Sequence, residues 1–203
     1  YFGFDLEDGV EPIPGEVPAE HRGAAIEALA DALLAGETVH PDQGPVRRAI
    51  LQLDELWRRS GGALGAASPE GRRAWALAQL AGIGSWREFL ERRLHLESVE
   101  LVDPVERDRL LALPNAVRVL GDTVAVEYEI EPGVGAVARL RLREGQARRL
   151  QPRDLPPLDR PVRFAVVRGN HPPLLADSPG GLREVLAREG PRHGGGRRHP
   201  GHR

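Results

Sequence analysis

The 203-residue chain contains no cysteine, no methionine and no lysine. The lack of cysteine excludes disulfides, thiolate catalysis and zinc sites built on sulfur. The lack of lysine excludes a phosphate-loop lysine and a Schiff-base lysine, and all 28 basic residues are therefore arginine. Because methionine is absent, Tyr1 is not a natural start, and we interpret the chain as a piece of a longer protein.

Aromatic side chains make up only 4% of the chain, against 40% hydrophobic residues overall. Aliphatic residues and alanine must therefore fill the cores, and the length is enough for one or two small domains. No apolar run approaches the roughly 18 to 20 residues needed to cross a bilayer, and no basic-then-apolar leader opens the chain. We therefore expect no membrane contact and a cytoplasmic location.

Residues 19–113 carry the marks of helices joined by short connections. Apolar residues recur at helical spacing over 19–34, and Gly36 follows where a C-terminal glycine would end the helix. A second helix is expected over 45–60. Three further helices are expected after the capping residues Ser68, Ser85 and Asp103. The pattern predicts a bundle of about five helices, which residues 1–18 link to a missing upstream domain.

The turn before the second helix holds two polar candidates. Asp42 is placed to cap that helix through its carboxylate. His40 has two interpretations: a ligand or catalytic base, or a loop residue that packs on a neighbour. Packing is the ordinary role of a lone histidine before a proline.

Period-two alternation begins after Pro114. Apolar residues occupy every second position of two runs within 117–130, and Gly121-Asp122 between these runs predicts a hairpin. The segment 132–135 predicts a second reversal, which leads to a third strand containing Leu140 and Leu142. After one short helical turn at 144–150, a fourth strand is expected over 161–168. Four short strands with a helical insertion are typical of a small barrel or a strongly curved sheet.

The C-terminal part completes the predicted organisation. A terminal helix is expected over 180–188. Residues 190–203 contain no acid, four arginines, three histidines and five glycines, a composition that cannot bury enough surface to fold. The sequence thus predicts an α+β chain: an N-terminal helical bundle over 19–113, a small antiparallel β-barrel-like domain over 114–189, and a disordered basic tail over 190–203.

Catalytic motifs are missing from the sequence. There is no Gly-rich phosphate loop with its lysine, no His-Glu-x-x-His and no Gly-x-Ser-x-Gly. Glu127, Glu129 and Glu131 share one strand face, and we interpret them as a solvated face rather than as catalytic carboxylates. The tail histidines lack a fixed geometry for metal binding. We therefore assign no catalytic residue, metal site or cofactor to this chain.

Arginine is the stronger functional candidate. Residues 1–60 hold twelve acids and five arginines, whereas residues 61–203 hold eighteen acids and 23 arginines, so a polyanion would bind the second part. A fold that gathers these arginines would neutralise several phosphates; a salt-bridged ordinary surface is the alternative. The candidate nucleic-acid-binding residues are Arg139, Arg141, Arg148, Arg149, Arg160, Arg163, Arg168 and, in the tail, Arg197 and Arg198.

Three segments form a recognisable series. Pro-Asp-Gln at 41–43 precedes a helix that ends Leu-Trp-Arg-Arg-Ser-Gly-Gly at residue 62; Leu113-Pro114 is followed by VAVEYEIEPG at 124–133; and DLPPLDRPVRFAVVRG spans 154–169. In pattern and order this series resembles the region C-terminal to the motor of bacterial DEAH-box ATP-dependent RNA helicases. The likeness covers nearly all of 19–190. The family's phosphate-loop Gly-Lys-Thr, Asp-Glu-Ala-His box and arginine finger are not in this chain.

The resemblance implies a specific role. The chain would be a non-catalytic C-terminal region that helps to hold or guide RNA by backbone contacts, with RNA and the motor domain of the same parent chain as partners. ATP and magnesium would belong to that motor. The alternative is a protein-interaction module that docks on a helicase core or a ribonucleoprotein partner through the acidic N-terminal helices.

Overall fold

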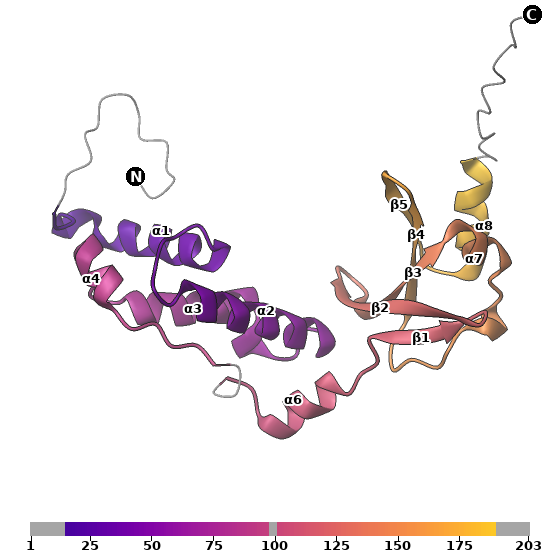
Figure 1. The fold of residues 1–203 in the computed structure, drawn as a ribbon, viewed down its shortest axis with the longest axis horizontal. Helices are drawn as coiled ribbons and strands as arrows, with labels where there is room; N and C mark the ends of the chain where they lie inside the picture. The colour runs from indigo at the N-terminus through magenta and orange to yellow at the C-terminus, as the bar shows by residue number, and fades with distance from the viewer. Residues whose placement is uncertain (1–14, 98–100, 190–203) are drawn as a thin grey trace, which may run out of the picture. The chain divides into compact units, whose positions relative to one another are not determined.

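The computed structural model describes residues 15–97 and 101–189. The chain divides into two compact units, Tyr1–Leu113 (unit 1) and Pro114–Arg203 (unit 2). Within the described residues, unit 1 is helical, whereas unit 2 combines a five-stranded sheet with helices (Figure 1). The predicted α+β class is confirmed.

Unit 1 is built around three longer helices, whose Leu33, Leu53 and Leu80 are fully buried in one core. The other α-helices placed within the described part of unit 1, α4 and α6, have six and eight residues, too few to run alongside the longer ones over their full length. The regular bundle expected from the sequence is therefore not confirmed. The described elements of unit 1 are η1 (Ala19–His21), α1 (Arg22–Ala35), α2 (Gln43–Arg59), η2 (Gly65–Ala67), α3 (Pro69–Leu80), α4 (Trp86–Glu91) and α6 (Pro104–Leu111).

Capping chemistry fixes where several of these helices begin and end. The hydroxyls of Ser68 and Ser85 each accept a backbone N–H from the first turn of the helix that follows. The carboxylate of Asp103 accepts two such N–H groups. Gly36 ends α1 at a φ of 78°, a conformation that costs glycine little. These caps are confirmed as the sequence predicts them.

The turn before α2 has a different role from the one predicted. Asp42 makes no side-chain cap; its carboxylate accepts the N–H of Leu94 at 2.9 Å instead. His40 is buried, with Nε2 3.0 Å from the carbonyl oxygens of both Phe89 and Arg92, and Nδ1 accepts the Asp42 N–H. Of the two interpretations of His40, packing on a neighbour therefore describes it, because both ring nitrogens serve local backbone groups.

Arg59 fixes the position of α6. It is 3% exposed and donates from Nε to Glu55 at 2.6 Å. Its Nη1 donates to the carbonyl oxygens of Leu110 and Leu113 at 3.0 and 2.8 Å. Those carbonyls lie at and beyond the end of α6, where helical partners are missing. A guanidinium on α2 therefore satisfies the C-terminal end of α6 and holds the two helices together.

Unit 2 is a sheet in the order β1-β2-β3-β4-β5. Antiparallel hairpins join β1 to β2 and β2 to β3, as predicted. The first turn falls on Leu120-Gly121, one residue earlier than expected, with positive φ at both positions. The strands are β1 (Ala116–Val119), β2 (Asp122–Glu131), β3 (Gly135–Arg143), β4 (Val162–Arg168) and β5 (His171–Ala176).

The barrel-like domain is not confirmed, and its pairing is not wholly antiparallel. β3 and β4 are parallel because residues 144–161 cross over between them instead of forming a hairpin. The sequence reading also missed β5, which contains Pro172 and Pro173. Proline lacks an N–H and is tolerated on edge strands. Since four-residue β1 and proline-bearing β5 form the two edges, the described sheet is open.

Two helices cover one face of this sheet. α7 (Glu144–Arg149) contacts β3 and β4, and α8 (Pro179–Arg188) contacts β5 and α7. A short turn, η3 (Pro152–Asp154), follows α7. Leu140, Leu142, Phe164 and Val166 are almost fully buried on the covered side. Leu182 of α8 is buried as well, so the alternation read from the sequence correctly separates the core face from the charged face.

Candidate binding surfaces

The sheet face opposite the helices carries six charged residues that bond to one another, which we call the Arg–Glu ladder: Glu127, Glu129, Glu131, Arg139, Arg141 and Arg163. Period-two alternation places the three glutamates of β2 on one face beside the arginines of β3 and β4. Each arginine donates to one glutamate. The shortest N–O distances are 2.6 Å for Arg139 with Glu129, 2.8 Å for Arg141 with Glu127 and 2.7 Å for Arg163 with Glu131.

The ladder balances charge at close range. Arg139 stands directly opposite Arg163 in the β3–β4 register, a like-charge pair that would repel without the glutamates. The hydrogen bond to Glu129 raises the pKa of Arg139 in spite of partial burial, and the charges of Glu129, Glu131 and Glu127 raise it further. Arg139 and Arg163 side chains are only 14% and 17% exposed. Within the ladder, the three positive and three negative groups balance, and by alternation only Arg118 and Arg143 add positive charge to this face among the described strands.

Most of the remaining candidate arginines are also paired. Arg148 donates to Glu144, Arg160 to Asp159 and Arg168 to Glu189. Arg149 donates to the carbonyl of Gly145 and has no carboxylate partner in the described part of the chain. Six of the seven candidates in that part therefore bond to an acid, and Arg197 and Arg198 lie outside the described residues.

Arg160 is a structural residue. Its guanidinium carbon lies 4.8 Å from the centre of the Tyr128 ring, within the range of a cation–π contact. Both Asp159 oxygens accept from it, and its side chain is 9% exposed. The Tyr128 hydroxyl in turn donates to the carbonyl of Pro114. Arg160 thus packs where a long nucleic-acid strand has little access.

The arginines that lack a carboxylate partner elsewhere in described unit 2 were not singled out from the sequence. Arg118, Arg143, Arg153, Arg183 and Arg188 are exposed, and Arg118 and Arg183 donate to backbone carbonyls. An arginine of this kind differs from a paired one only in whether an acid lies three or four residues away on a helix, or opposite it on a neighbouring strand. The sequence shows the helical spacing directly, but it does not show which residues of two strands lie opposite each other.

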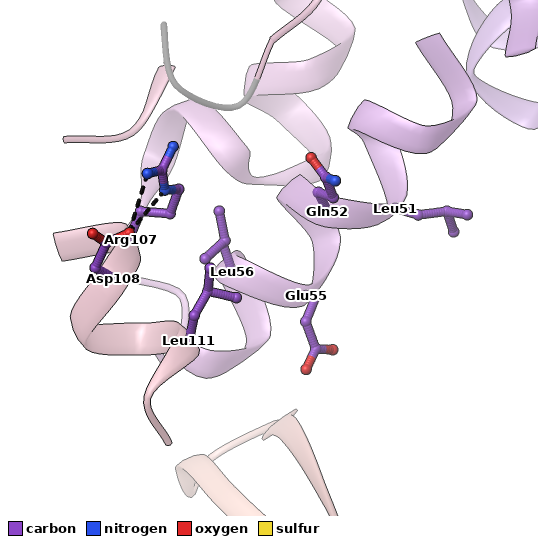
Figure 2. A pocket seen from close by; sticks show the side chains of 7 residues that line it. All are labelled: Leu51, Gln52, Glu55, Leu56, Arg107, Asp108 and Leu111. Carbon is purple, nitrogen blue, oxygen red and sulfur yellow. Dashed lines mark hydrogen bonds and ion pairs between the residues drawn. The ribbon is translucent and has the colours of Figure 1, made fainter. Parts of the chain in front are cut away.

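Unit 1 contains a groove between α2 and α6 (Figure 2), which the sequence did not indicate. Its volume is about 480 Å³. Leu56 is buried in it, whereas Leu51 and Leu111 are 61% and 53% exposed. The polar lining residues are Gln52, Glu55, Arg107 and Asp108.

A second hollow of about 410 Å³ continues along the same side of α2. It shares Gln52 and Arg107 with the first and is lined further by Arg48, Leu96 and Glu97. Arg48 is exposed and has no ion-pair partner among the residues described. The two hollows form what we call the α2–α6 groove, with exposed leucines in the first hollow and Arg48, Arg107 and Glu97 in the second.

Neither a metal-binding group nor a membrane-spanning helix is found in the described segments. They contain no group of three or more His, Asp or Glu side chains arranged to hold a metal ion. None of the helices placed by the structure is both long and apolar enough to span a bilayer. Comparisons with protein-family models, with curated proteins and with solved structures give no match.

Proposed function

We propose that the chain is a non-catalytic accessory region that binds a protein partner through unit 1, and that this partner is the motor domain of an ATP-dependent RNA helicase. The helicase assignment rests on the sequence resemblance of segments 41–62, 113–133 and 154–169. The protein-binding role is carried by one observation: leucines more than half exposed line the α2–α6 groove. Exposed apolar surface around a groove is typical of interaction sites.

The geometry favours this role over RNA retention by the predicted arginines. A site for a phosphate chain needs positive charge that is not already neutralised. The Arg–Glu ladder has none to spare, and Arg160 and Arg168 are paired and largely buried. The acidic character of unit 1, with twenty acids against twelve arginines in residues 1–113, also disfavours a nucleic-acid surface there.

Calorimetric titration of the chain with the separately expressed motor domain of its parent protein tests the proposal. We expect saturable one-to-one binding that persists at raised salt, because apolar burial is not screened by ions. A titration that gives no heat at micromolar concentrations, together with no co-elution in gel filtration, would refute the proposal. Sequencing upstream of Tyr1 tests the family assignment separately, since the motor must contain a phosphate-loop lysine.

Weak RNA backbone contact is the second candidate, and a specific observation favours it. Arg149, Arg153, Arg183 and Arg188 have no carboxylate partner in the described residues, and the four tail arginines follow α8 directly. Filter binding of single-stranded RNA over a range of salt concentrations measures this contact. The affinity should fall by about 0.7 in log K per log salt for each phosphate neutralised; salt-independent binding would exclude this mode.

A further inference from the structure

The α2–α6 groove has the length and shape of a helix-binding site. The residues of α2 that line it are Pro45, Arg48, Ala49, Leu51, Gln52, Glu55 and Leu56. Their spacing of three to four residues marks one side of a helix over three turns, roughly 16 Å at 1.5 Å per residue. An amphipathic helix laid into such a groove makes contacts at the same spacing.

The two ends of the groove differ in chemistry. In the first hollow Leu51 and Leu111 are exposed and Leu56 is buried, so apolar side chains of the partner would bury surface that is in water now. At the other end Glu97 lines the same hollow as Arg48, but Arg48 forms no ion pair with it or with any other described residue. Arg107 also lines that end but is already bonded to Asp108 at 3.1 Å. A carboxylate is therefore the group that Arg48 would recognise.

Resting on the proposed protein-binding function, we propose that the α2–α6 groove binds an amphipathic helix of the partner that presents apolar side chains to Leu51 and Leu111 and a carboxylate, one to two turns away, to Arg48. The walls of the site are fixed in advance, because Arg59 joins α2 to the end of α6. A preformed groove lowers the ordering cost of binding.

Two capped helical peptides of about fourteen residues, in an Ala/Gln background, provide the probe. Both contain two leucines at i and i+4, and they differ only in a Glu or a Lys placed one to two turns away. Fluorescence anisotropy with the full chain should show tighter binding of the Glu peptide. Each peptide is also made in the reversed order, because the groove does not specify the direction of the helix.

Matched substitutions locate the site. Leu51→Ser with Leu111→Ser should weaken the Glu peptide at least tenfold, because both apolar contacts are lost. Leu175→Ser in β5 is the control, since Leu175 is 56% exposed and lies outside the groove; it should leave the affinity unchanged. These residues are exposed, so the fold should survive, which the melting temperature checks.

A charge reversal tests the polar end. Arg48→Glu should lose its preference for the Glu peptide and gain one for the Lys peptide, a change that damage to the fold would not produce. The inference would be overturned if the native chain bound both peptides equally or bound neither in either order. It would also be overturned if Leu175→Ser weakened binding as much as Leu51→Ser with Leu111→Ser does.

The outcomes remain separable from those of the proposed function. Motor-domain binding that survives Leu51→Ser with Leu111→Ser would leave the proposed function standing and refute the groove. Peptide binding without motor-domain binding would support the groove as a helix-binding site and refute the motor domain as its partner.

Discussion

Removing the Arg59 guanidinium should lower the stability of unit 1 much more than removing the guanidinium of its neighbour Arg58 on the same helix. Arg59→Ala deletes the donor to the Leu110 and Leu113 carbonyls and breaks the 2.6 Å bond to Glu55. The neighbouring Arg58 offers a matched control. Its side chain is 40% exposed and forms ordinary ion pairs with Asp54 and Glu55.

The expected magnitude follows from these contacts. Hydrogen bonds that involve a charged group contribute roughly 1.5–3 kcal/mol each. Leu110 keeps a second partner, the Leu113 N–H at 3.2 Å, so its carbonyl is not left bare. The exposed part of Glu55 returns to water. We therefore expect Arg59→Ala to lower the free energy of unfolding by about 3 kcal/mol, and Arg58→Ala by about 0.5 kcal/mol.

Tryptophan fluorescence during urea unfolding measures the difference selectively. The three tryptophans of the chain, Trp57, Trp75 and Trp86, all belong to unit 1, so the signal reports that unit alone. Arg59→Lys should give an intermediate loss, because one ammonium group cannot reach all three acceptors. Equal destabilisation by Arg58→Ala and Arg59→Ala would refute the role assigned to Arg59.

Three further changes test the local reasoning in unit 1. Gly71→Ala should cost about 1–3 kcal/mol, because the added carbon would clash with the Gly65 carbonyl oxygen of η2, whereas Gly23→Ala in open space should gain about 0.5 kcal/mol; calorimetric melting of both variants checks the opposite signs. His40→Ala should cost about 2 kcal/mol, because the Arg92 carbonyl and the Asp42 N–H lose their side-chain partner while the Phe89 carbonyl keeps the Arg92 N–H, and an unchanged urea midpoint would contradict this. The hydrogen bond from Arg109 lowers the pKa of Glu106, so its stabilising contribution is present at neutral pH and is lost as the pH falls through that lowered pKa. Glu106→Gln should therefore flatten the fall in melting temperature between about pH 6 and pH 3, and parallel profiles would count against it.

Local signals predicted the helix boundaries well because they act over a few residues. Ser68, Ser85 and Asp103 cap helices whose start depends only on the next turn. Asp42 has the same local pattern, yet its carboxylate bonds to Leu94, fifty-two positions away. A competing N–H donor at that separation leaves no mark in the local sequence. This is why a cap can be predicted by rule and still be wrong.

The candidate site shows the same limit in the sheet. Alternation correctly placed Arg139 and Arg141 on the face opposite the core, and it also placed Glu127 and Glu129 on a face of β2. It could not show that the two faces are the same one, because that depends on the register of β2 against β3. The α2–α6 groove is less predictable still, since it needs the packing of two helices.

The prolines of β5 have a consequence for the protein in concentrated solution. The edge strand of an open sheet has unpaired backbone groups that can pair with a strand of another molecule, and the exposed Leu175 on β5 would favour such association. Pro172 and Pro173 are adjacent, so one of them removes an amide donor from the outer edge of β5, which interrupts the ladder that a second molecule would form. Unit 2 can thus leave an apolar rim in water and still resist stacking into fibrils.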